Sequence, residues 1–178
     1  MRNIVIFLPV IMCCFFCCKG NKNKTEIQAQ ETVLEWTGKQ IQYPGDVQCC
    51  VLGKDTISNL CNSLLQKEYK ILLYVDSAGC SGCRLKLLEW KQLIAEADTL
   101  FPQKLAFVFF IQPKSKKEAI FLFRKDNFRY PAFIDMNDDL NKLNHFPTQV
   151  EFQCFLLDEN NKVLMIGNPV LNVARADL

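Results

Sequence analysis

The chain has 178 residues, of which 49% are hydrophobic, and this size fits one globular domain with additional terminal segments. Its formal net charge is only +2, which is too small to indicate a nucleic-acid-binding protein, so we expect no nucleic-acid partner. Ten cysteines is a high number for this length, but their irregular spacing excludes a small domain held together mainly by disulfides.

Residues 1–18 are predicted to be a targeting segment. Arg2 supplies a positive charge, and residues 4–18 are uncharged and apolar. This run is shorter than the ~20 residues of a membrane-spanning helix and contains a proline, so it fits a secretory signal better than a span. It resembles a bacterial lipoprotein signal, in which a cysteine becomes the lipidated first residue of the mature chain. The resemblance implies lipidation of Cys18, and the alternative is an uncleaved short anchor.

Either form of this segment predicts a domain outside the inner membrane, in an oxidising compartment. Residues 19–32 are polar and lack aromatic side chains, so we expect a flexible tether there. The predicted domain therefore covers residues 33–178. The resemblance of the signal to that of bacterial lipoproteins implies a membrane-anchored lipoprotein of the bacterial envelope that faces the periplasm.

An N-terminal β-hairpin is expected at the start of the domain. Residues 40–43 alternate like an edge strand, and a Pro-Gly turn separates them from a second short strand at residues 47–52. Because neighbours along a strand point to opposite faces, one of Cys49 and Cys50 should face inward and the other outward. We expect structural roles for both, with a vicinal disulfide as the strained alternative.

A first helix is predicted after this hairpin. Ser58 is a suitable capping residue, and Leu60, Cys61, Leu64 and Leu65 share the apolar side of the helix that would follow it. We therefore interpret Cys61 as a core residue.

The most informative stretch is Tyr69 to Lys91. An apolar run at residues 71–75 predicts a buried strand, and a short loop separates it from the motif Cys80-Ser81-Gly82-Cys83. A helical stripe follows, formed by Cys83, Leu87, Trp90, Ile94 and Ala97. The pattern predicts a strand, a turn and a CxxC motif that opens a helix.

This placement of the CxxC motif predicts redox chemistry. Free N–H groups and the positive end of the helix dipole stabilise a thiolate at a helix start. We therefore predict that Cys80 is the nucleophile and that Cys83, one turn further on, resolves the mixed disulfide. The alternatives are a structural disulfide and a zinc site. The CxxC loop is too short for a disulfide there to add much stability. A structural zinc site needs four ligands, and the chain has no second CxxC motif and only one histidine, His145.

Residues 105–111 form a continuous apolar run, which predicts a strand buried on both faces. Ser115 and Glu118 have the spacing of a capping box, and the helix that they predict runs to about residue 127. The lysines at 114, 116 and 117 are consistent with an anion-binding site, although solvated surface charge is the simpler interpretation.

The last part of the chain predicts a second hairpin. A short strand at residues 131–136 and a brief helical turn around Leu140 precede strands at residues 152–157 and 162–166, and any helix after Pro169 is two turns at most. Strand–helix–strand units give parallel pairs, whereas the hairpin is antiparallel. The predicted fold class is therefore α/β, with a mixed sheet flanked by helices and an N-terminal β-hairpin extension.

The strand before the CxxC motif and the terminal hairpin FQCFLLDENNKVLMIGNP together resemble the thioredoxin-like fold, and most closely the membrane-anchored thiol–disulfide oxidoreductases of bacterial envelopes. The resemblance covers roughly residues 33–170. It implies thiol–disulfide exchange without a cofactor or metal, with protein thiols and disulfides as substrates and an envelope protein as redox partner. It favours a reductive task, although the Ser81-Gly82 dipeptide leaves the direction of electron flow open.

Two positions depart from the family pattern. A cis-proline usually precedes the first strand of the terminal hairpin and faces the CxxC motif, but Gln153 has that place here and Pro147 lies six residues earlier. Gln153 and Cys154 are therefore candidate neighbours of the active site, with a buried structural role as the alternative for Cys154. The buried acid of thioredoxin would fall at Tyr74.

Two other functions stay open. The first is a thioredoxin-fold binding or redox-sensing module with little turnover, because the missing cis-proline usually shapes the substrate groove. The second is a copper carrier in which Cys80, Cys83 and His145 bind the metal, since copper-delivery proteins of this fold use two cysteines and a distal histidine, and His145 lies in the loop before the last hairpin.

Overall fold

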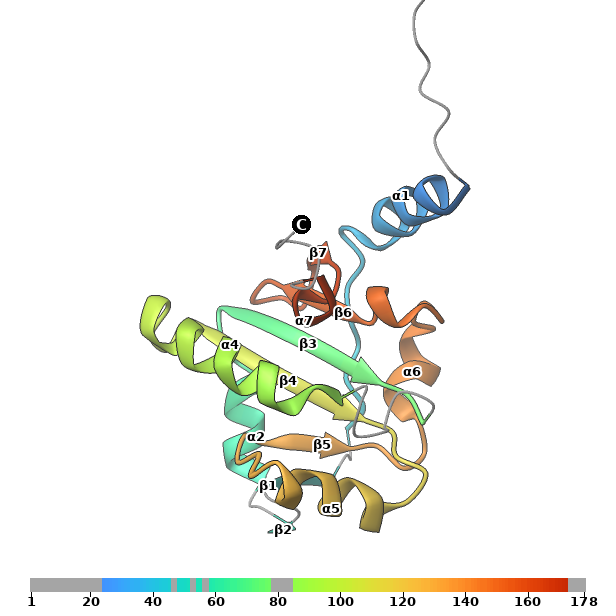
Figure 1. Ribbon diagram of the computed structural model, residues 1–178. Coiled ribbons are helices and arrows are strands. Elements are labelled where there is room, and N and C mark those ends of the chain that lie inside the picture. Colours follow the sequence, from blue (N-terminus) through green and yellow to red (C-terminus); the bar gives the residue numbers. More distant parts are fainter. Residues whose placement is uncertain (1–23, 46–47, 52–53, 56–57, 78–84, 173–178) are drawn as a thin grey trace, which may run out of the picture.

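The computed structural model describes residues 24–45, 48–51, 54–55, 58–77 and 85–172. These residues form a seven-stranded mixed sheet with the order β2-β1-β5-β4-β3-β6-β7 (Figure 1). The strands are β1 (Gln48–Val51), β2 (Lys54–Asp55), β3 (Tyr69–Val75), β4 (Leu105–Ile111), β5 (Ala132–Ile134), β6 (Cys154–Leu157) and β7 (Val163–Ile166). The helices are α1 (Lys24–Trp36), α2 (Ser58–Leu65), α4 (Leu87–Leu100), α5 (Lys116–Lys125), α6 (Asp139–Asn144) and α7 (Pro169–Asn172), with a 3-10 turn at Val150–Phe152.

Strands β3 and β4 form the centre of the sheet. They pair in parallel from Tyr69 opposite Leu105 to Val75 opposite Ile111, and β4 is buried along nearly its whole length. Strand β5 continues the parallel part, whereas β6 and β7 form the predicted antiparallel hairpin on the other side of β3. The sequence-based prediction of an α/β mixed sheet is therefore confirmed.

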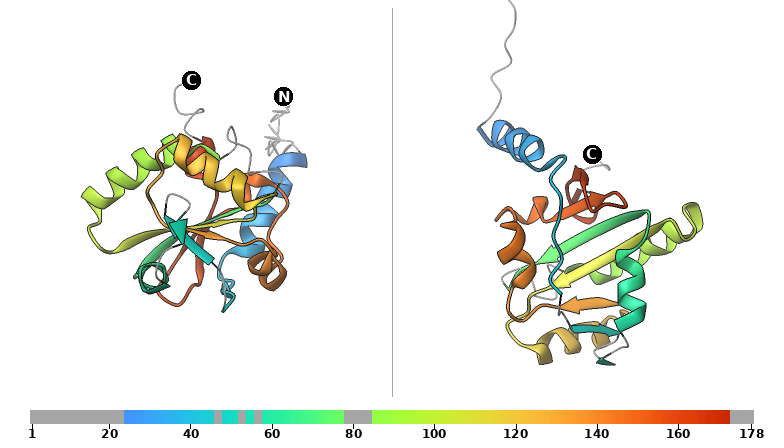
Figure 2. Two further views of the ribbon diagram at one scale, coloured as in Figure 1. Left: turned by 90° about the horizontal axis from the view of Figure 1, so that it is seen from below. Right: turned by 180° about the vertical axis from the view of Figure 1, so that it is seen from behind.

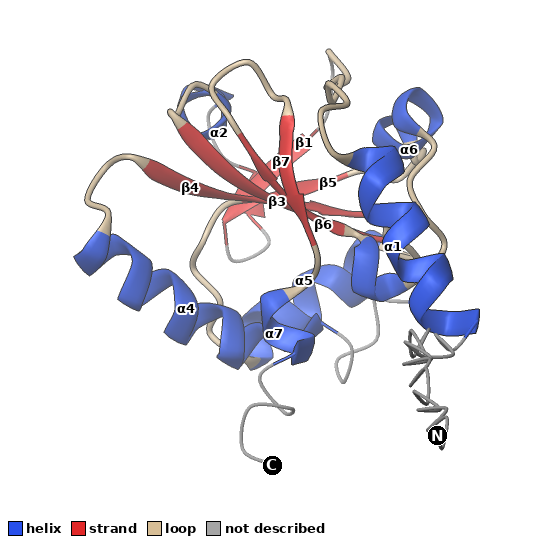
Figure 3. Cartoon of the chain, turned by 90° about the horizontal axis from the view of Figure 1, so that it is seen from above, coloured by secondary structure: helices blue, strands red, loops and turns tan. Residues whose placement is uncertain are grey.

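Helices cover both faces of this sheet (Figure 3). Helices α4, α5 and α7 share one hydrophobic cluster with the odd-numbered residues of β3, such as Leu73 and Val75. Helix α2, helix α6 and the end of α1 share a second cluster with the even-numbered residues Leu72 and Tyr74. The predicted stripe of α4 is confirmed in its described part: Leu87, Trp90, Ile94 and Ala97 are all buried.

The start of α4 differs from the prediction. Leu85 is helical and buried, but Lys86 lies in the left-handed region with φ 44° and ψ 46°, and α4 begins only at Leu87. An L-residue in this conformation interrupts a right-handed helix. The predicted stripe is therefore not carried by one continuous helix, and Cys80 and Cys83 lie outside the described residues.

The N-terminal hairpin is composed differently from the prediction. Residues 40–43 form no strand, and only Gln40 makes an isolated bridge, to Lys162 beside β7. The antiparallel pair at this end of the sheet is instead β1 with β2, and β1 pairs on its other edge with β5. The prediction of a strand at residues 40–43 was thus wrong, because Gln40 bridges to the β7 edge of the sheet, opposite the edge formed by β2.

Residues 24–32, where the sequence predicts a tether, belong to α1. The helix projects from the sheet, as the right view of Figure 2 shows, and most of its side chains are exposed. Its last residue, Trp36, is buried against Phe146 and Phe155, with ring centroids 5.6 and 5.1 Å away. One aromatic side chain therefore fastens this helix to the domain. Among the described helices, none combines the length and apolar character needed to cross a membrane.

Candidate functional site

The carboxyl ends of β3, β4 and β5 meet at one edge of the sheet, and the chain leaves β3 there toward the CxxC motif. Backbone and side-chain hydrogen bonds fix this edge: Gln112 donates its N–H to the carbonyl of Val75 over 2.8 Å, and its Oε1 accepts from the N–H of Ser77 at 3.1 Å. The edge of an open α/β sheet beyond the carboxyl ends of its strands is where such folds hold their ligands.

The redox pair itself, Cys80 and Cys83, lies outside the described residues, as does the predicted lipidation site Cys18. The residues on either side of the pair are described. Val75 ends β3, Leu85 follows Cys83 by two positions, and both are buried in the same hydrophobic cluster as Trp90. The chain therefore enters and leaves the CxxC segment from one core.

Gln153 occupies the position that the resemblance assigns to a cis-proline. It is buried, its carbonyl accepts a hydrogen bond from the N–H of Tyr74 at 2.9 Å, and its Nε2 donates to the carbonyl of Pro147 at 3.0 Å. The described part of the chain has no cis peptide bond. Gln153 thus joins β3 to the loop that contains Pro147, with an amide side chain where the resemblance implies a proline.

Cys154 begins β6 and lies opposite Leu73 of β3. It is a free cysteine that is 1% exposed, and burial raises the pKa of its thiol to about 12. A thiol with this pKa stays protonated at neutral pH and is a poor nucleophile. Cys154 lines an apolar cavity of about 320 Å³ together with Ile71, Leu156 and Met165. Because Cys80 lies outside the described residues, the expected place of Cys154 beside the redox pair stays a prediction.

Tyr74 has the position expected for the buried acid of thioredoxin, but its side chain serves another contact. It belongs to the hydrophobic cluster on the face opposite α4, and its hydroxyl donates to Asp138 Oδ1 at 2.6 Å. Burial, the hydrogen bond to Asp138 and the nearby carboxylates together raise the pKa of this phenol far above its usual value. Tyr74 therefore stays neutral and does not replace an acid on the α4 face.

A disulfide between Cys49 and Cys61 joins β1 to α2, with the two Cα atoms 6.4 Å apart. Sequence reasoning placed both residues in structural roles but did not pair them. It was wrong to expect one of Cys49 and Cys50 to face outward: both are buried, on opposite faces, because helices cover both sides of β1. A signal for this pairing was present in the sequence: Cys61 lies on the predicted apolar side of α2, and Cys49 lies on one face of β1. The two residues belong to one core cluster.

The metal-binding alternative depends on His145. This residue caps the C-terminal end of α6 in the left-handed conformation, with φ 56°, and its side chain is exposed. Within the described residues, no three His, Cys, Asp or Glu side chains gather as a metal site would require. Because Cys80 and Cys83 are not among these residues, the copper-carrier interpretation stays a prediction.

Comparison with known proteins gives a fold but no close relative. No protein-family model and no curated protein sequence matches the chain. Among similar solved structures, a thiol-disulfide oxidoreductase from Bacteroides fragilis NCTC 9343 is 15% identical, with a TM-score of 0.54 over 78% of this chain and 98% of that chain. The peroxidoxin BcpB from Mycobacterium tuberculosis is 16% identical, with a TM-score of 0.54 over 79% and 92%.

A third similar structure is the thioredoxin domain of a thiol-disulfide oxidoreductase from Bacteroides vulgatus. It is 14% identical and has a TM-score of 0.51 over 79% of this chain and 96% of that chain. At these identities the similarity establishes the fold alone. The thioredoxin-like fold predicted from the sequence is confirmed.

Proposed function

We propose that this chain, which has a thioredoxin-like fold, is a thiol–disulfide oxidoreductase whose redox pair is Cys80 and Cys83. One observation carries the proposal: the CxxC motif follows the carboxyl end of the central strand β3 and precedes the helix that packs on it. Residues on both sides of the motif, Val75 and Leu85, are anchored in one core. This supports a position for the two thiols at the edge of the sheet that binds ligands in such folds.

The proposed reaction moves two electrons from the protein to a disulfide of the substrate. The thiolate of Cys80 attacks one substrate sulfur, forms a mixed disulfide and releases the other substrate sulfur as a thiolate. Cys83, as a thiolate, then attacks the Cys80 sulfur, which breaks the mixed disulfide and releases the second substrate thiol. The protein is left with a Cys80–Cys83 disulfide, which a dithiol reductant of the envelope would return to the reduced form.

Trapping of the mixed disulfide tests the two roles. In cells, Cys83→Ser should accumulate mixed disulfides that disappear on reduction, because the resolving thiol is missing. Cys80→Ser should show few, because the attacking thiol is missing. Equal trapping by both variants, or trapping only by Cys80→Ser, would overturn the assignment. The redox potential of the pair, measured against a glutathione buffer, would decide between a reductant and an oxidant.

We further propose that the chain is a lipoprotein of the bacterial envelope, anchored at Cys18 and facing the periplasm. The apolar run that ends in cysteines before a polar segment supports this location. Labelled fatty acid should be incorporated into the wild-type chain and not into Cys18→Ala. Labelling that persists in this variant would show that another residue carries the lipid or refute the lipidation of Cys18. The partners in this location would be envelope proteins with disulfides and an upstream redox protein.

A second candidate is a binding or redox-sensing module with the same fold and little turnover. Gln153 favours it, because a buried glutamine bonded to the Pro147 carbonyl stands where the family usually has a cis-proline that shapes the substrate groove. Reduction of a disulfide substrate by the purified protein separates the two functions. Repeated turnover supports the oxidoreductase, whereas a single stoichiometric exchange supports the module.

A further inference from the structure

The solvent face of α5 combines positive charge with an exposed aromatic ring. Lys117, Phe121, Arg124 and Lys125 follow one another at spacings of four, three and one residues, which places them on one side of a helix with about 3.6 residues per turn. We call these four residues the basic stripe. All four are exposed, and the opposite side of α5, with Ala119, Leu122 and Phe123, is buried in the core.

Positive charge is concentrated around this helix. Residues 114–129 contain six Lys and Arg and two carboxylates, a net charge of +4, whereas the whole chain has a net charge of only +2. The two carboxylates, Glu118 and Asp126, are half-buried and lie outside the basic stripe. Among the described residues, no ion pair or hydrogen bond engages the side-chain nitrogens of the stripe. These cations are therefore free to pair with another molecule.

Phe121 lies between the cations and is 63% exposed. Solvation accounts for surface lysines and arginines by themselves, but an aromatic ring in their midst gains nothing from water. Aromatic and arginine side chains side by side are the residue types that carry most of the energy of protein interfaces. The stripe thus has the composition of a docking surface, with a ring to bury and charges around it.

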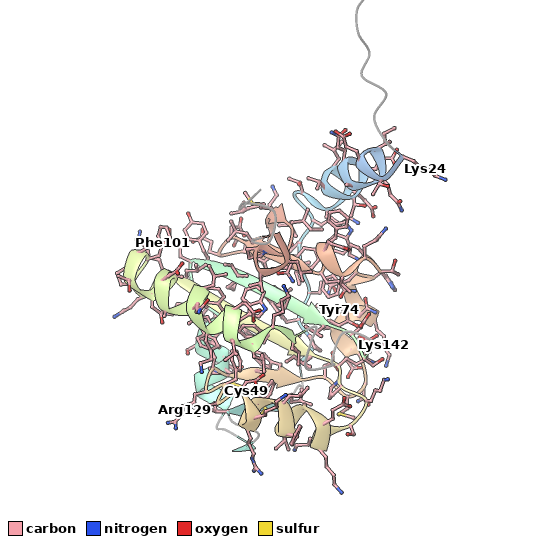
Figure 4. All side chains as sticks on the ribbon, in the orientation of Figure 1. Lys24, Cys49, Tyr74, Phe101, Arg129 and Lys142 are labelled. Atoms are coloured by element: carbon pink, nitrogen blue, oxygen red, sulfur yellow. A yellow bond between two sulfur atoms is a disulfide. The ribbon has the colours of Figure 1, made fainter. Side chains whose placement is uncertain are left out.

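We propose that the basic stripe of α5 docks an acidic protein surface, in which an apolar side chain or pocket receives Phe121 and carboxylates pair with Lys117, Arg124 and Lys125. A membrane surface fits less well. A helix that lies on a membrane inserts a broad apolar face among the lipids, but the apolar face of α5 is buried in the core of the domain. The stripe also lies far from α1: Lys24 at the start of α1 and Arg129, which follows α5, mark opposite ends of the molecule (Figure 4).

The test uses a fluorescein-labelled peptide of repeated Glu-Leu-Glu-Glu units as the acidic probe, with binding followed by fluorescence anisotropy at several salt concentrations. The triple variant Lys117→Glu, Arg124→Glu, Lys125→Glu should bind at least tenfold more weakly and show a shallower dependence on salt. The matched control Lys24→Glu, Lys104→Glu, Lys142→Glu has the same net charge and reverses exposed cations elsewhere, so its affinity should change by less than about threefold.

The contribution of Phe121 is measured separately. Phe121→Ser should weaken binding of the Glu-Leu peptide by about threefold to tenfold without changing its salt dependence, and should leave binding of a matched Glu-Ser peptide unchanged. The glutamine triple variant at the same three cations, checked for helix content by circular dichroism, should show an intermediate loss and guards against unfolding of α5. Equal losses in the two charge-reversed triples, no effect of Phe121→Ser, or tighter binding to phosphatidylglycerol vesicles than to the peptide would each overturn the proposal.

Discussion

The two faces of the sheet are stabilised in different ways. On the face that packs against α4, which we call the α4 face, aromatic rings meet mostly edge to face. The ring centroids of Trp90 and Phe109 are 5.5 Å apart at 88°, and those of Phe109 and Phe128 are 5.2 Å apart at 85°. Two helices of 14 and 10 residues, α4 and α5, cover this face with continuous apolar sides.

The opposite face, which we call the disulfide face, is covered by the short helices α2 and α6 and by the segment of residues 40–43. Specific links hold these pieces. They are the Cys49–Cys61 disulfide, the hydrogen bond from Tyr74 to Asp138, and the Asn144 side chain, which both accepts from the N–H of Gln42 and donates to its carbonyl. The difference indicates that long amphipathic helices stabilise a sheet face mainly through the apolar area that they bury, whereas short helices depend more on covalent or polar links.

The largest expected effect is loss of the central ring of the α4 face. Trp90→Ala should lower the free energy of unfolding by about 3–5 kcal/mol, because Trp90 is 1% exposed and its removal leaves a cavity among rigid rings. Urea denaturation measures this loss. Leu88→Ala is the control on the same helix, and since Leu88 is 57% exposed its cost should stay below about 0.5 kcal/mol. A cost under about 1 kcal/mol for Trp90→Ala would show that the rings do not dominate this face.

Removal of the disulfide tests the opposite face. The bond closes a loop with a sequence separation of 12 and should contribute about 3 kcal/mol, so the double variant Cys49→Ala, Cys61→Ala should lose about 4 kcal/mol under oxidising conditions once the truncated side chains are included. Denaturation with and without dithiothreitol isolates the contribution of the bond. In reductant the wild type and the double variant should differ by only about 1 kcal/mol, the residual cost of truncating two buried side chains. An equal gap in both conditions would mean that the bond contributes no stability.

Tyr74→Phe should cost about 1–2 kcal/mol at neutral pH, because it removes a 2.6 Å hydrogen bond to Asp138 on the disulfide face. Asp138 keeps its bond from Asn141 Nδ2, which limits the loss. Chemical denaturation provides the measurement. Tyr69→Phe is the control, since Tyr69 is 38% exposed and its substitution should be nearly neutral.

The stabilising effect of Tyr74 should also depend on pH. The pKa of Tyr74 is raised in the folded state, chiefly by burial, so its contribution to stability is complete below the unfolded pKa of about 10 and is lost as the pH rises above it. The stability gap between wild type and Tyr74→Phe should therefore narrow at increasingly alkaline pH. A gap that widens above this pH would contradict the assigned direction.

The smallest effect concerns the cap of α5 on the α4 face. Ser115→Ala should lower the free energy of unfolding by about 1 kcal/mol, because the Ser115 hydroxyl accepts a hydrogen bond from the N–H of Glu118 at 3.2 Å. Thermal denaturation detects a change of this size. Ser115→Asp keeps a capping acceptor and should retain nearly full stability. If Ser115→Ala and Ser115→Asp lower the free energy of unfolding by the same amount, this cap does not stabilise the α4 face.

The α4 face was predictable from local pattern. The run at residues 105–111 indicates a strand buried on both faces, the spacing of Leu87, Trp90 and Ile94 indicates the buried side of α4, and Ser115 indicates the start of α5. These signals lie within a few residues of one another, and the periods of strand and helix convert them directly into buried faces. Only the motif of the candidate site was predictable, because the CxxC pattern identifies the two cysteines but does not determine which residues surround them.

The disulfide face depended on contacts between distant residues. The sequence contains Cys49, Cys50 and Cys61, but the pairing was decided by the position of β1 beside β5, where helices cover both faces of β1. Local composition also predicted a tether where α1 forms. The residue that attaches α1 to the domain, Trp36, contacts aromatic rings more than a hundred positions later, and local composition carries no signal of such a contact.

Lys70 shows the limit of sequence reasoning most directly. Its position in β3 follows from the sequence, yet its charged side chain is fully buried, and burial lowers its pKa. The Nζ atom donates to the carbonyls of Lys67 and Glu159, at 3.1 and 3.2 Å, and the second of these lies 89 residues away in the turn between β6 and β7. The sequence determined the central strands, the buried sides of α4 and α5 and the redox motif, because each depends on neighbouring residues. The tertiary structure decided which buried polar groups find partners, because those partners come from distant parts of the chain.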